Sequence, residues 1–308
     1  AYVLFRMVGS PTLVRLGKFG LTVALRLRIP IKRIIRITVF DYFCGGESIA
    51  ECEPTIARLH RSGVLSLLDY SSEGKETAHE LDLSAAEIRA ANSTGTGDKR
   101  VPFSVFKPTA IFPNKLLAKK NAGAAFSDKE EAMWQAAKTR MNTICITAKK
   151  NDVPILVDAE ESWFQNAIDD LVEEQMQCHN TEKVIVYNTI QLYRKDRLDF
   201  LKRSFEKAQS GGYKLGVKLV RGAYMEKERE RAKDQGYPSP IHDSKSDTDR
   251  DYDLALEFCV NNFPNIQLVA GTHNEDSSKR LVSLMTDSNI QPSDSHIYFS
   301  QLYGMSDN

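Results

Sequence analysis

Seven short apolar runs, mostly of β-branched residues, recur along the chain and constrain its fold more than any other feature. Their first residues lie 29 to 52 positions apart, which is the length that a helix and its two loops occupy between parallel strands. Helical periodicity between the runs, as at Phe164, Ile168 and Leu171, fits repeated β-α units in an α/β protein. The runs are Val64–Leu68, Phe103–Phe106, Ile155–Val157, Val184–Tyr187, Leu215–Val220, Ile266–Ala270 and His296–Phe299.

Two parallel architectures fit these runs, a doubly wound open sheet and a (β/α)8 barrel. No G-x-G-x-x-G motif follows the first run, whereas a barrel needs one more strand and helix than the runs supply. Polar residues at the carboxyl ends of the runs favour the barrel, because there those ends converge on one ligand-binding face. These residues are Asp69, Lys107, Asp158, Gln191, Arg221 and His273.

The net charge is zero, with 41 basic and 41 acidic side chains, which argues against a general nucleic-acid binder. Residues 1–40 nevertheless carry eight basic and no acidic side chains. This segment fits a solvated basic helix packed on the acidic remainder, an interfacial arm attracted to anionic lipid, or the remnant of a targeting segment. The basic residues are Arg6, Arg15, Lys18, Arg26, Arg28, Lys32, Arg33 and Arg36.

The cysteines and histidines show no spacing typical of a disulfide framework or a metal site. Cys44, Cys52, Cys145, Cys178 and Cys259 include no C-x-x-C pair, which favours free thiols in a reducing compartment. We therefore expect no bound metal.

The segment Lys218-Leu-Val-Arg-Gly-Ala-Tyr-Met-Glu226 holds the densest chemical signal. The run ends at Val220 and is followed by the cation Arg221 and by Gly222-Ala223, whose main-chain N–H groups can approach a phosphate or a flavin ring. The alternative is a simple turn, since Arg-Gly alone is often only that. Val157-Asp-Ala-Glu-Glu161 brings three carboxylates to another strand end, where they repel, raise a pKa or hold a cation. The alternative is an acidic helix N-terminus, which explains Glu160 and Glu161 better than Asp158.

Lys107 and His273 also stand at strand ends. Pro108 keeps Lys107 extended, so that its side chain can pair with a carboxylate, form a Schiff base or stabilise negative charge on a cofactor, if it is not simply a solvated surface lysine. His273 fits a metal ligand, a general base, a hydrogen-bond donor or a structural polar residue.

Four motifs follow one another in a specific order: Asp158-Ala-Glu-Glu, Asn188-Thr-Ile-Gln-Leu-Tyr193, Lys218 through Glu228, and Gly271-Thr-His-Asn274. In this order and spacing, over roughly residues 60–308, the chain resembles the proline dehydrogenases. Phe43-Cys-Gly-Gly-Glu47 is similar to the monofunctional form rather than to the barrel of a bifunctional proline-utilisation protein. The resemblance implies a basic helical arm over residues 1–60 and a distorted (β/α)8 barrel holding non-covalent FAD over residues 61–308.

The resemblance also implies roles for single residues. Lys107, Asp158 and Arg221 match catalytic positions, with Asp158 expected to orient the two cations. Lys107, Asp69 and Glu73 match the substrate side, although Ser71-Ser72 replaces the Leu-Gly usual in the family. The cofactor-binding positions are matched by Ala159, Gln191, Lys218, Val220, Gly222, Ala223, Tyr224, Lys245, Thr248, Thr272, His273 and Asn274.

In the family, the barrel closes with an eighth strand and a helix whose Arg-Arg-x-x-Glu-Asn motif clamps the proline carboxylate. No Arg-Arg follows Gln301, so we expect the eighth strand and helix to be absent up to Asn308. Substrate binding should then be weak, because a bidentate Arg–carboxylate pair is among the strongest polar contacts.

The activity that the resemblance implies is oxidation of L-proline to Δ1-pyrroline-5-carboxylate by hydride transfer to flavin N5, with a membrane quinone as electron acceptor. The alternatives are a hydroxyproline-oxidising relative and a non-catalytic flavin-binding barrel. The expected location is the bacterial cytoplasm or the periphery of the inner membrane, with the mitochondrial matrix or inner membrane as the alternative.

A quinone acceptor would give residues 1–40 a role in peripheral membrane contact. Removal of these residues should release the protein from vesicles of anionic lipid, because basic residues near such a surface contribute about 1 kcal/mol each. Cosedimentation measures the bound fraction, with neutral vesicles as the control. Binding that is unchanged by the deletion would contradict this role.

Overall fold

The computed structural model describes residues 17, 20, 21, 26, 36, 40–69 and 75–305. Contacts divide the chain into two units, Ala1–Glu53 with Tyr303–Asn308, and Pro54–Leu302. The first unit holds α4 (Asp41–Phe43) and the start of α5 (Ile49–Arg61). The basic segment 1–40 lies outside the described residues, apart from a few single positions.

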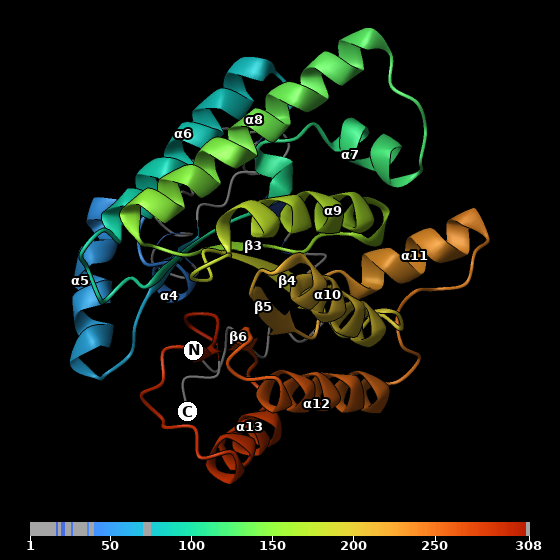
Figure 1. The fold of residues 1–308 in the computed structure, drawn as a ribbon. Coiled ribbons are helices and arrows are strands. Elements are labelled where there is room, and N and C mark those ends of the chain that lie inside the picture. The colour runs from blue at the N-terminus through green and yellow to red at the C-terminus, as the bar shows by residue number, and fades with distance from the viewer. Residues whose placement is uncertain are drawn as a thin grey trace. The chain divides into compact units, whose positions relative to one another are not determined.

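Strands and helices alternate along the second unit (Figure 1). The strands are β1 (Leu67–Asp69), β2 (Phe103–Phe106), β3 (Ile155–Val157), β4 (Val186–Gln191), β5 (Leu215–Val220), β6 (Ile266–Gly271) and β7 (Ile297–Ser300). The helices that connect them are α6 (Ala78–Thr94), the 3-10 turn η2 (Pro108–Ala110), α7 (Asn114–Asn121), α8 (Asp128–Asn151), α9 (Ser162–His179), α10 (Arg197–Gly211), α11 (Met225–Gln235), α12 (Lys245–Asn261) and α13 (Glu275–Asp287). The repeated β-α pattern predicted from the apolar runs is confirmed.

All seven strands are parallel and pair in the order of the chain, from β1 to β7. A doubly wound sheet would reverse its strand order at a switch point, so this order is that of a β/α barrel. The sheet is curled, because the ring of Phe103 in β2 meets that of Tyr298 in β7 with centroids 4.8 Å apart. The prediction of a barrel-type parallel sheet is confirmed. Among the described strands, β1 and β7 do not pair with each other.

Four strands differ in their limits from the predicted runs. β6 ends at Gly271 rather than Ala270, and β7 runs from Ile297 to Ser300 rather than from His296 to Phe299. β1 begins at Leu67 rather than Val64, because Val64 and Leu65 are exposed in the segment after α5. β4 runs from Val186 to Gln191 rather than from Val184 to Tyr187, so Gln191 belongs to the strand itself.

Both faces of the central strands β2 to β6 are largely buried, as is typical of parallel sheets, whereas β1 and β7 are partly exposed. A large apolar cluster that includes Phe106, Val157 and Val217 lies between the sheet and the helices. Side chains alternate between the two faces along each strand, so the residues next to those of the outer cluster face inward and form a second cluster. This inner cluster consists of Phe103, Val105, Leu156, Val184, Tyr187 and Val269. The Tyr187 hydroxyl donates to Gln267 Oε1 at 2.8 Å and completes the packing inside the curled sheet.

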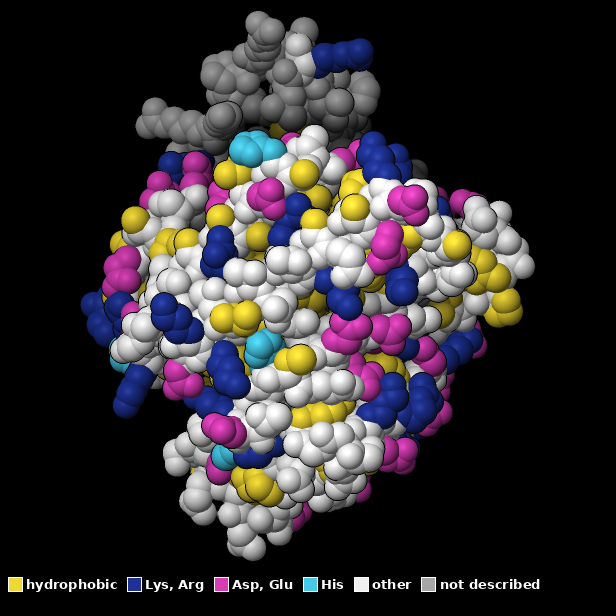
Figure 2. Space-filling model, turned by 45° about the horizontal axis from the view of Figure 1, so that its top comes forward, with side chains coloured by type: hydrophobic (Ala, Val, Ile, Leu, Met, Phe, Trp, Pro, Cys, Tyr) yellow, Lys and Arg dark blue, Asp and Glu magenta, His cyan; other side chains and the backbone are white. Residues whose placement is uncertain are grey.

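Charged side chains of both signs are interspersed on the face shown in Figure 2. Ion pairs also join neighbouring helices, such as Arg140 of α8 with Asp82 of α6 and Lys138 of α8 with Glu174 of α9. This mixture agrees with the neutral composition of the chain.

Asn180 fixes the point where β4 begins. Its side chain is fully buried and makes four hydrogen bonds to main-chain groups. Oδ1 accepts from the amides of Ile185 and Val186, both at 2.9 Å. Nδ2 donates to the carbonyls of Val186 and Lys214 at 2.8 and 3.2 Å, so one amide joins the segments that lead into β4 and β5.

Replacement of Asn180 by alanine should therefore lower the free energy of unfolding by about 3 kcal/mol, because buried main-chain groups lose their partners. Urea denaturation measures the change. Asn166→Ala is the matched control, since Asn166 is exposed in α9 and its removal should alter stability by less than about 0.5 kcal/mol. An equally small effect at Asn180 would rule out this role.

Candidate active site at the carboxyl ends of the strands

Asp158 and Lys218 form an ion pair on the inner side of the sheet. Asp158 follows β3 and Lys218 lies within β5, on either side of β4. Thr189 of β4 lies between them and donates from Oγ1 to Asp158 Oδ1 at 3.4 Å. Since both charged side chains are less than one-fifth exposed, each compensates the other where solvent screening is weak.

Arg221 directly follows β5 and donates a hydrogen bond from each of its three guanidinium nitrogens. Nε donates to Asp249 Oδ1 at 2.6 Å, Nη1 to Thr272 Oγ1 at 2.7 Å and Nη2 to Ser277 Oγ at 3.0 Å. The guanidinium carbon also lies 4.5 Å from the centroid of the Tyr252 ring, a cation–π contact. These partners hold the plane of the guanidinium in one orientation.

Asp249, rather than Asp158, is therefore the carboxylate that orients Arg221. Burial opposes the ionisation of Asp249, but hydrogen bonds from Lys245 and Arg221 outweigh it and lower the pKa of the carboxyl. Among the described residues, the hydrogen bonds and ion pairs of the Asp158 carboxylate are those with Lys218 and Thr189. The expectation that Asp158 orients Arg221 is wrong in this structure.

Gly222 and Ala223 expose main chain beside Arg221. Gly222 has φ +136°, and a Cβ there would lie 2.4 Å from the Tyr193 ring, so this position requires glycine. The Ala223 amide donates to Gln191 Oε1 at 3.3 Å. Gln191 Nε2 in turn donates to the Glu160 carbonyl at 2.8 Å, so Gln191 bridges the ends of β3 and β5.

The segment Thr272-His273-Asn274 follows β6 and opens α13. Thr272 Oγ1 accepts from Arg221 and from the Asn274 amide, and the Asn274 side chain caps α13 by accepting from Ser277 N. His273 Nε2 accepts from the Leu302 amide at 3.1 Å, which assigns the ring proton to Nδ1. Nδ1 is buried and has no hydrogen-bond partner among the described residues.

Lys245 and Thr248 lie on α12, close in sequence to Asp249, the residue whose carboxylate contacts Arg221. Lys245 is exposed and pairs with Asp249 at 2.5 Å, so Asp249 connects it to Arg221. Thr248 is buried. The structure therefore brings the start of α12 to the ends of β5 and β6.

The remaining predicted residues occupy other strand ends. Lys107 follows β2 in an extended conformation and is half-buried, while Asp69 is the exposed last residue of β1. Val220 and Ala159 lie at the ends of β5 and β3, next to Arg221 and Asp158, and Tyr224 directly precedes α11. Glu73 lies outside the described residues.

Glu160 is a buried carboxylate between β3 and the start of α9. It accepts from the Thr109 amide at 2.9 Å and from Thr109 Oγ1 at 2.7 Å, while Glu161 pairs with Lys227 of α11. Glu161 stands at the N-cap of α9 but makes no capping hydrogen bond through its side chain. Both residues thus stand at the N-terminus of α9, as the acidic-terminus alternative expects, but each carboxylate also binds a residue of another element.

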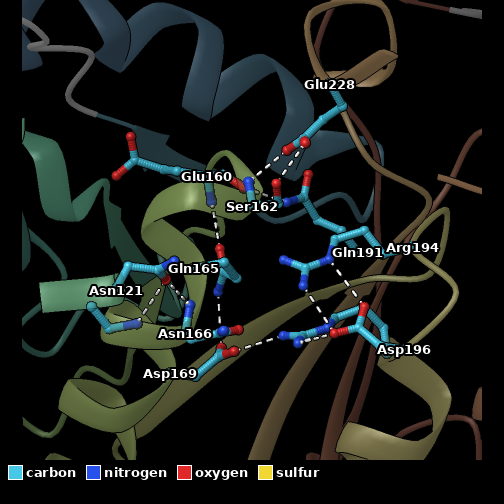
Figure 3. Close-up of polar contacts among 12 residues, drawn as sticks. Asn121, Glu160, Ser162, Gln165, Asn166, Asp169, Gln191, Arg194, Asp196 and Glu228 are labelled. Atoms are coloured by element: carbon cyan, nitrogen blue, oxygen red, sulfur yellow. Dashed lines mark hydrogen bonds and ion pairs between the residues drawn. The ribbon is translucent and has the colours of Figure 1, made fainter. Parts of the chain in front are cut away.

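Glu228 is a further residue that sequence reasoning missed. It is fully buried and its carboxylate accepts from the amide and hydroxyl of Ser162 at 2.5 and 2.6 Å (Figure 3). This contact fixes α11, and with it the Gly222–Tyr224 segment, against the start of α9. Its position in an otherwise exposed charged helix gives no signal of burial in the sequence.

The strand ends together combine cationic side chains, open main chain and an unpartnered donor. Lys107, Lys218 and Arg221 supply positive charge, Gly222-Ala223 allows close approach, and His273 Nδ1 supplies the donor. These features fit a cofactor that is anionic, planar and rich in hydrogen-bond acceptors, as FAD is. Within the described residues, no group of three or more His, Cys, Asp or Glu could hold a metal ion.

The fold and site define a protein with a barrel-type parallel β/α sheet and a cluster of charged and polar side chains at the carboxyl ends of its strands. The family model described as proline dehydrogenase matches residues 52–308, so the chain belongs to the proline dehydrogenase family.

Individual relatives agree with this assignment. The chain is 32% identical over 326 residues to proline dehydrogenase 1, mitochondrial, of Dictyostelium discoideum, covering 92% of this chain and 57% of that protein. It is 28% identical to hydroxyproline dehydrogenase of Xenopus laevis, covering 99% of this chain and 73% of that protein. The chain thus spans little more than half the length of the Dictyostelium relative.

The fold is also found in a crystal structure of proline utilization A from Bdellovibrio bacteriovorus inactivated by N-propargylglycine. The TM-score is 0.75 at 19% identity, over 86% of this chain and 28% of that protein. At this identity, the similarity extends to the fold alone.

Glu160 gives the site a testable pH dependence. Burial raises the pKa of Glu160 to about 7, against hydrogen bonds from Thr109 that lower it. The folded protein therefore binds this proton more tightly than the unfolded chain, whose value is 4.5. The resulting stabilisation is complete below the unfolded pKa and is lost as the pH rises through about 7.

The free energy of unfolding should fall by up to about 3 kcal/mol between about pH 5 and pH 8 on account of Glu160, at about 1.4 kcal/mol per pKa unit. Glu160→Gln removes this contribution. Urea denaturation of both proteins across the pH range measures it, and parallel curves would exclude the titration of Glu160.

Proposed function

We propose that the chain catalyses the FAD-dependent oxidation of L-proline to Δ1-pyrroline-5-carboxylate. The observation that carries the proposal is the fixed guanidinium of Arg221 beside the open main chain of Gly222 and Ala223, in a chain of the proline dehydrogenase family. A group with this charge and orientation suits the electron-accepting part of a flavin. FAD supplies the redox chemistry by accepting a hydride from the ring carbon next to the proline nitrogen.

The cations of the site have a clear electrostatic task. A bound flavin would gain negative charge on reduction, and cationic groups oriented beforehand would stabilise that charge without reorganising. Arg221 is oriented by Asp249, Thr272 and Ser277, and Lys218 is oriented by Asp158. Lys107 contributes a third positive charge from the end of β2 and faces the substrate in this proposal.

Cofactor recognition is assigned to the residues around these cations. His273 Nδ1, Gln191 and the Gly222–Tyr224 segment offer hydrogen bonds or open main chain to the flavin ring. Lys245 offers a charge to its phosphates. Ala159, Val220, Thr248, Thr272 and Asn274 complete the proposed cofactor site, while Asp69 and Glu73 are assigned to the substrate side.

A hydroxyproline-oxidising enzyme is the second candidate. It is favoured by the similarity to the Xenopus hydroxyproline dehydrogenase, which extends over 99% of this chain. Rates measured on L-proline and hydroxyproline with the same preparation distinguish the two activities.

We also propose a membrane quinone as the electron acceptor. The described residues contain no helix that could span a membrane. In this proposal, contact with a bilayer is peripheral and involves the basic residues 1–40. The proposed location is the bacterial cytoplasm or inner-membrane periphery. The mitochondrial matrix or inner membrane is the alternative, since the Dictyostelium relative is mitochondrial by name.

The visible absorbance of the purified protein tests the proposal directly. We expect a flavin spectrum that bleaches on addition of L-proline without oxygen. A flavin spectrum without bleaching by either imino acid would favour the non-catalytic flavin-binding barrel. A colourless protein that takes up no added FAD would refute the proposed function.

Arg221→Ala and Lys107→Ala should each lower turnover about 100-fold, because preorganised charge at the acceptor contributes on this scale. FAD content, measured from the absorbance ratio, should fall much less than turnover. Arg231→Ala and Lys233→Ala are matched controls on the exposed side of α11 and should retain turnover. Full activity of either site variant would show that its assigned role is wrong.

A further inference from the structure

Glu160 connects the end of β2 to the end of β3 through its carboxylate. Both oxygens are bonded to Thr109, one to the amide and one to the hydroxyl, and both residues are less than 5% exposed. Thr109 stands two residues after Lys107 in the η2 turn, where the Lys107 carbonyl accepts from the Ala110 amide. The position of the Lys107 main chain is thus tied to Glu160.

The main chain of Glu160 is fixed on both sides as well. Its carbonyl accepts from Gln191 Nε2 at 2.8 Å, and its amide donates to Gln165 Oε1 at 2.8 Å. Gln165 Nε2 donates to Asp169 Oδ1 at 2.9 Å, and Arg197 Nη1 donates to Asp169 Oδ2 at 2.6 Å. The hydrogen-bond network therefore reaches from the site into the helix layer (Figure 3). Every side chain in this path is at least nine-tenths buried.

We propose that Glu160 is a positioning residue that ties the Lys107–Thr109 segment to Gln191 and thereby sets the spacing of two residues of the flavin site. The inference rests on the proposed function, because that function makes Lys107 and Gln191 partners of one ligand. Glu160 touches neither substrate nor cofactor in this role. It acts through Thr109 on one side and through Gln191 on the other.

The neighbouring carboxylate shows that this arrangement is particular to Glu160. Glu161 is equally buried but pairs with Lys227, whose side chain is 62% exposed on α11. Lys107 and Glu161 are the charged groups that act on Glu160, with opposite signs. A carboxylate without a positioning role would need only one partner, whereas Glu160 makes hydrogen bonds through both carboxylate oxygens, its amide and its carbonyl.

Substitutions at Thr109 separate hydrogen bonding from packing. Valine keeps the shape of threonine but removes the hydroxyl, while serine keeps the hydroxyl and removes a methyl group. If Glu160 positions the segment, Thr109→Val and Glu160→Gln should each raise the FAD dissociation constant of the apoprotein about 10-fold, since a buried carboxylate oxygen or its partner is left unsatisfied. Thr109→Ser should bind FAD like the unmodified chain.

A double variant tests whether the two residues act through one contact. Quenching of flavin fluorescence gives each dissociation constant. The FAD dissociation constant of the Glu160→Gln/Thr109→Val double variant should exceed that of the unmodified chain by no more than about 10-fold. Hydrogen exchange of the amides of Lys107 and residues 109–112, measured without FAD, should rise in both single variants and remain unchanged in Glu161→Gln.

The outcomes separate this proposal from the proposed function. Failure of the unmodified chain to bind FAD refutes the proposed function, whatever the variants do. If the unmodified chain binds FAD, three results each overturn the role of Glu160: unchanged affinity in Glu160→Gln, additive losses of about 100-fold in the double variant, or weak binding in Thr109→Ser with normal binding in Thr109→Val.

Discussion

Parallel pairing of seven consecutive strands puts their carboxyl ends on one side of the sheet, and the polar chemistry of the chain depends on this constraint. Lys107, Asp158 and Arg221 come from distant parts of the sequence and share this edge because of it. Tyr187, Phe103 and Val269 fill the space inside the curled sheet. The charged groups are therefore confined to the rim, where they can meet a ligand.

Charge compensation determines how the cations of the rim are oriented. Lys218 is paired with Asp158 and Arg221 with Asp249, each in a partly buried setting where an unpaired charge would be costly. The partner of Arg221 comes from α12 and its other two contacts come from the segment after β6 and from α13. One guanidinium thus couples β5 to the next two β-α elements.

Buried polar groups connect this rim to the rest of the fold. Glu160, Gln165 and Asp169 carry a continuous hydrogen-bonded path from the strand ends to Arg197 at the start of α10. Glu228 fixes α11 against α9 in the same way. Because these groups are satisfied by one another, they favour one arrangement of the helices around the site.

The sequence by itself determined the β-α repeat, the barrel-type sheet and the strand-end position of residues such as Lys107, Asp158 and Arg221, because apolar periodicity and local motifs are written in neighbouring residues. Only the tertiary structure decided the pairings: Asp249 rather than Asp158 holds Arg221, and the Glu160 carboxylate binds Thr109. Asp249 and Glu160 each stand among several acidic residues in their own segments of the sequence. Their partners lie 28 and 51 residues away, so burial and three-dimensional contact select which carboxylate is used.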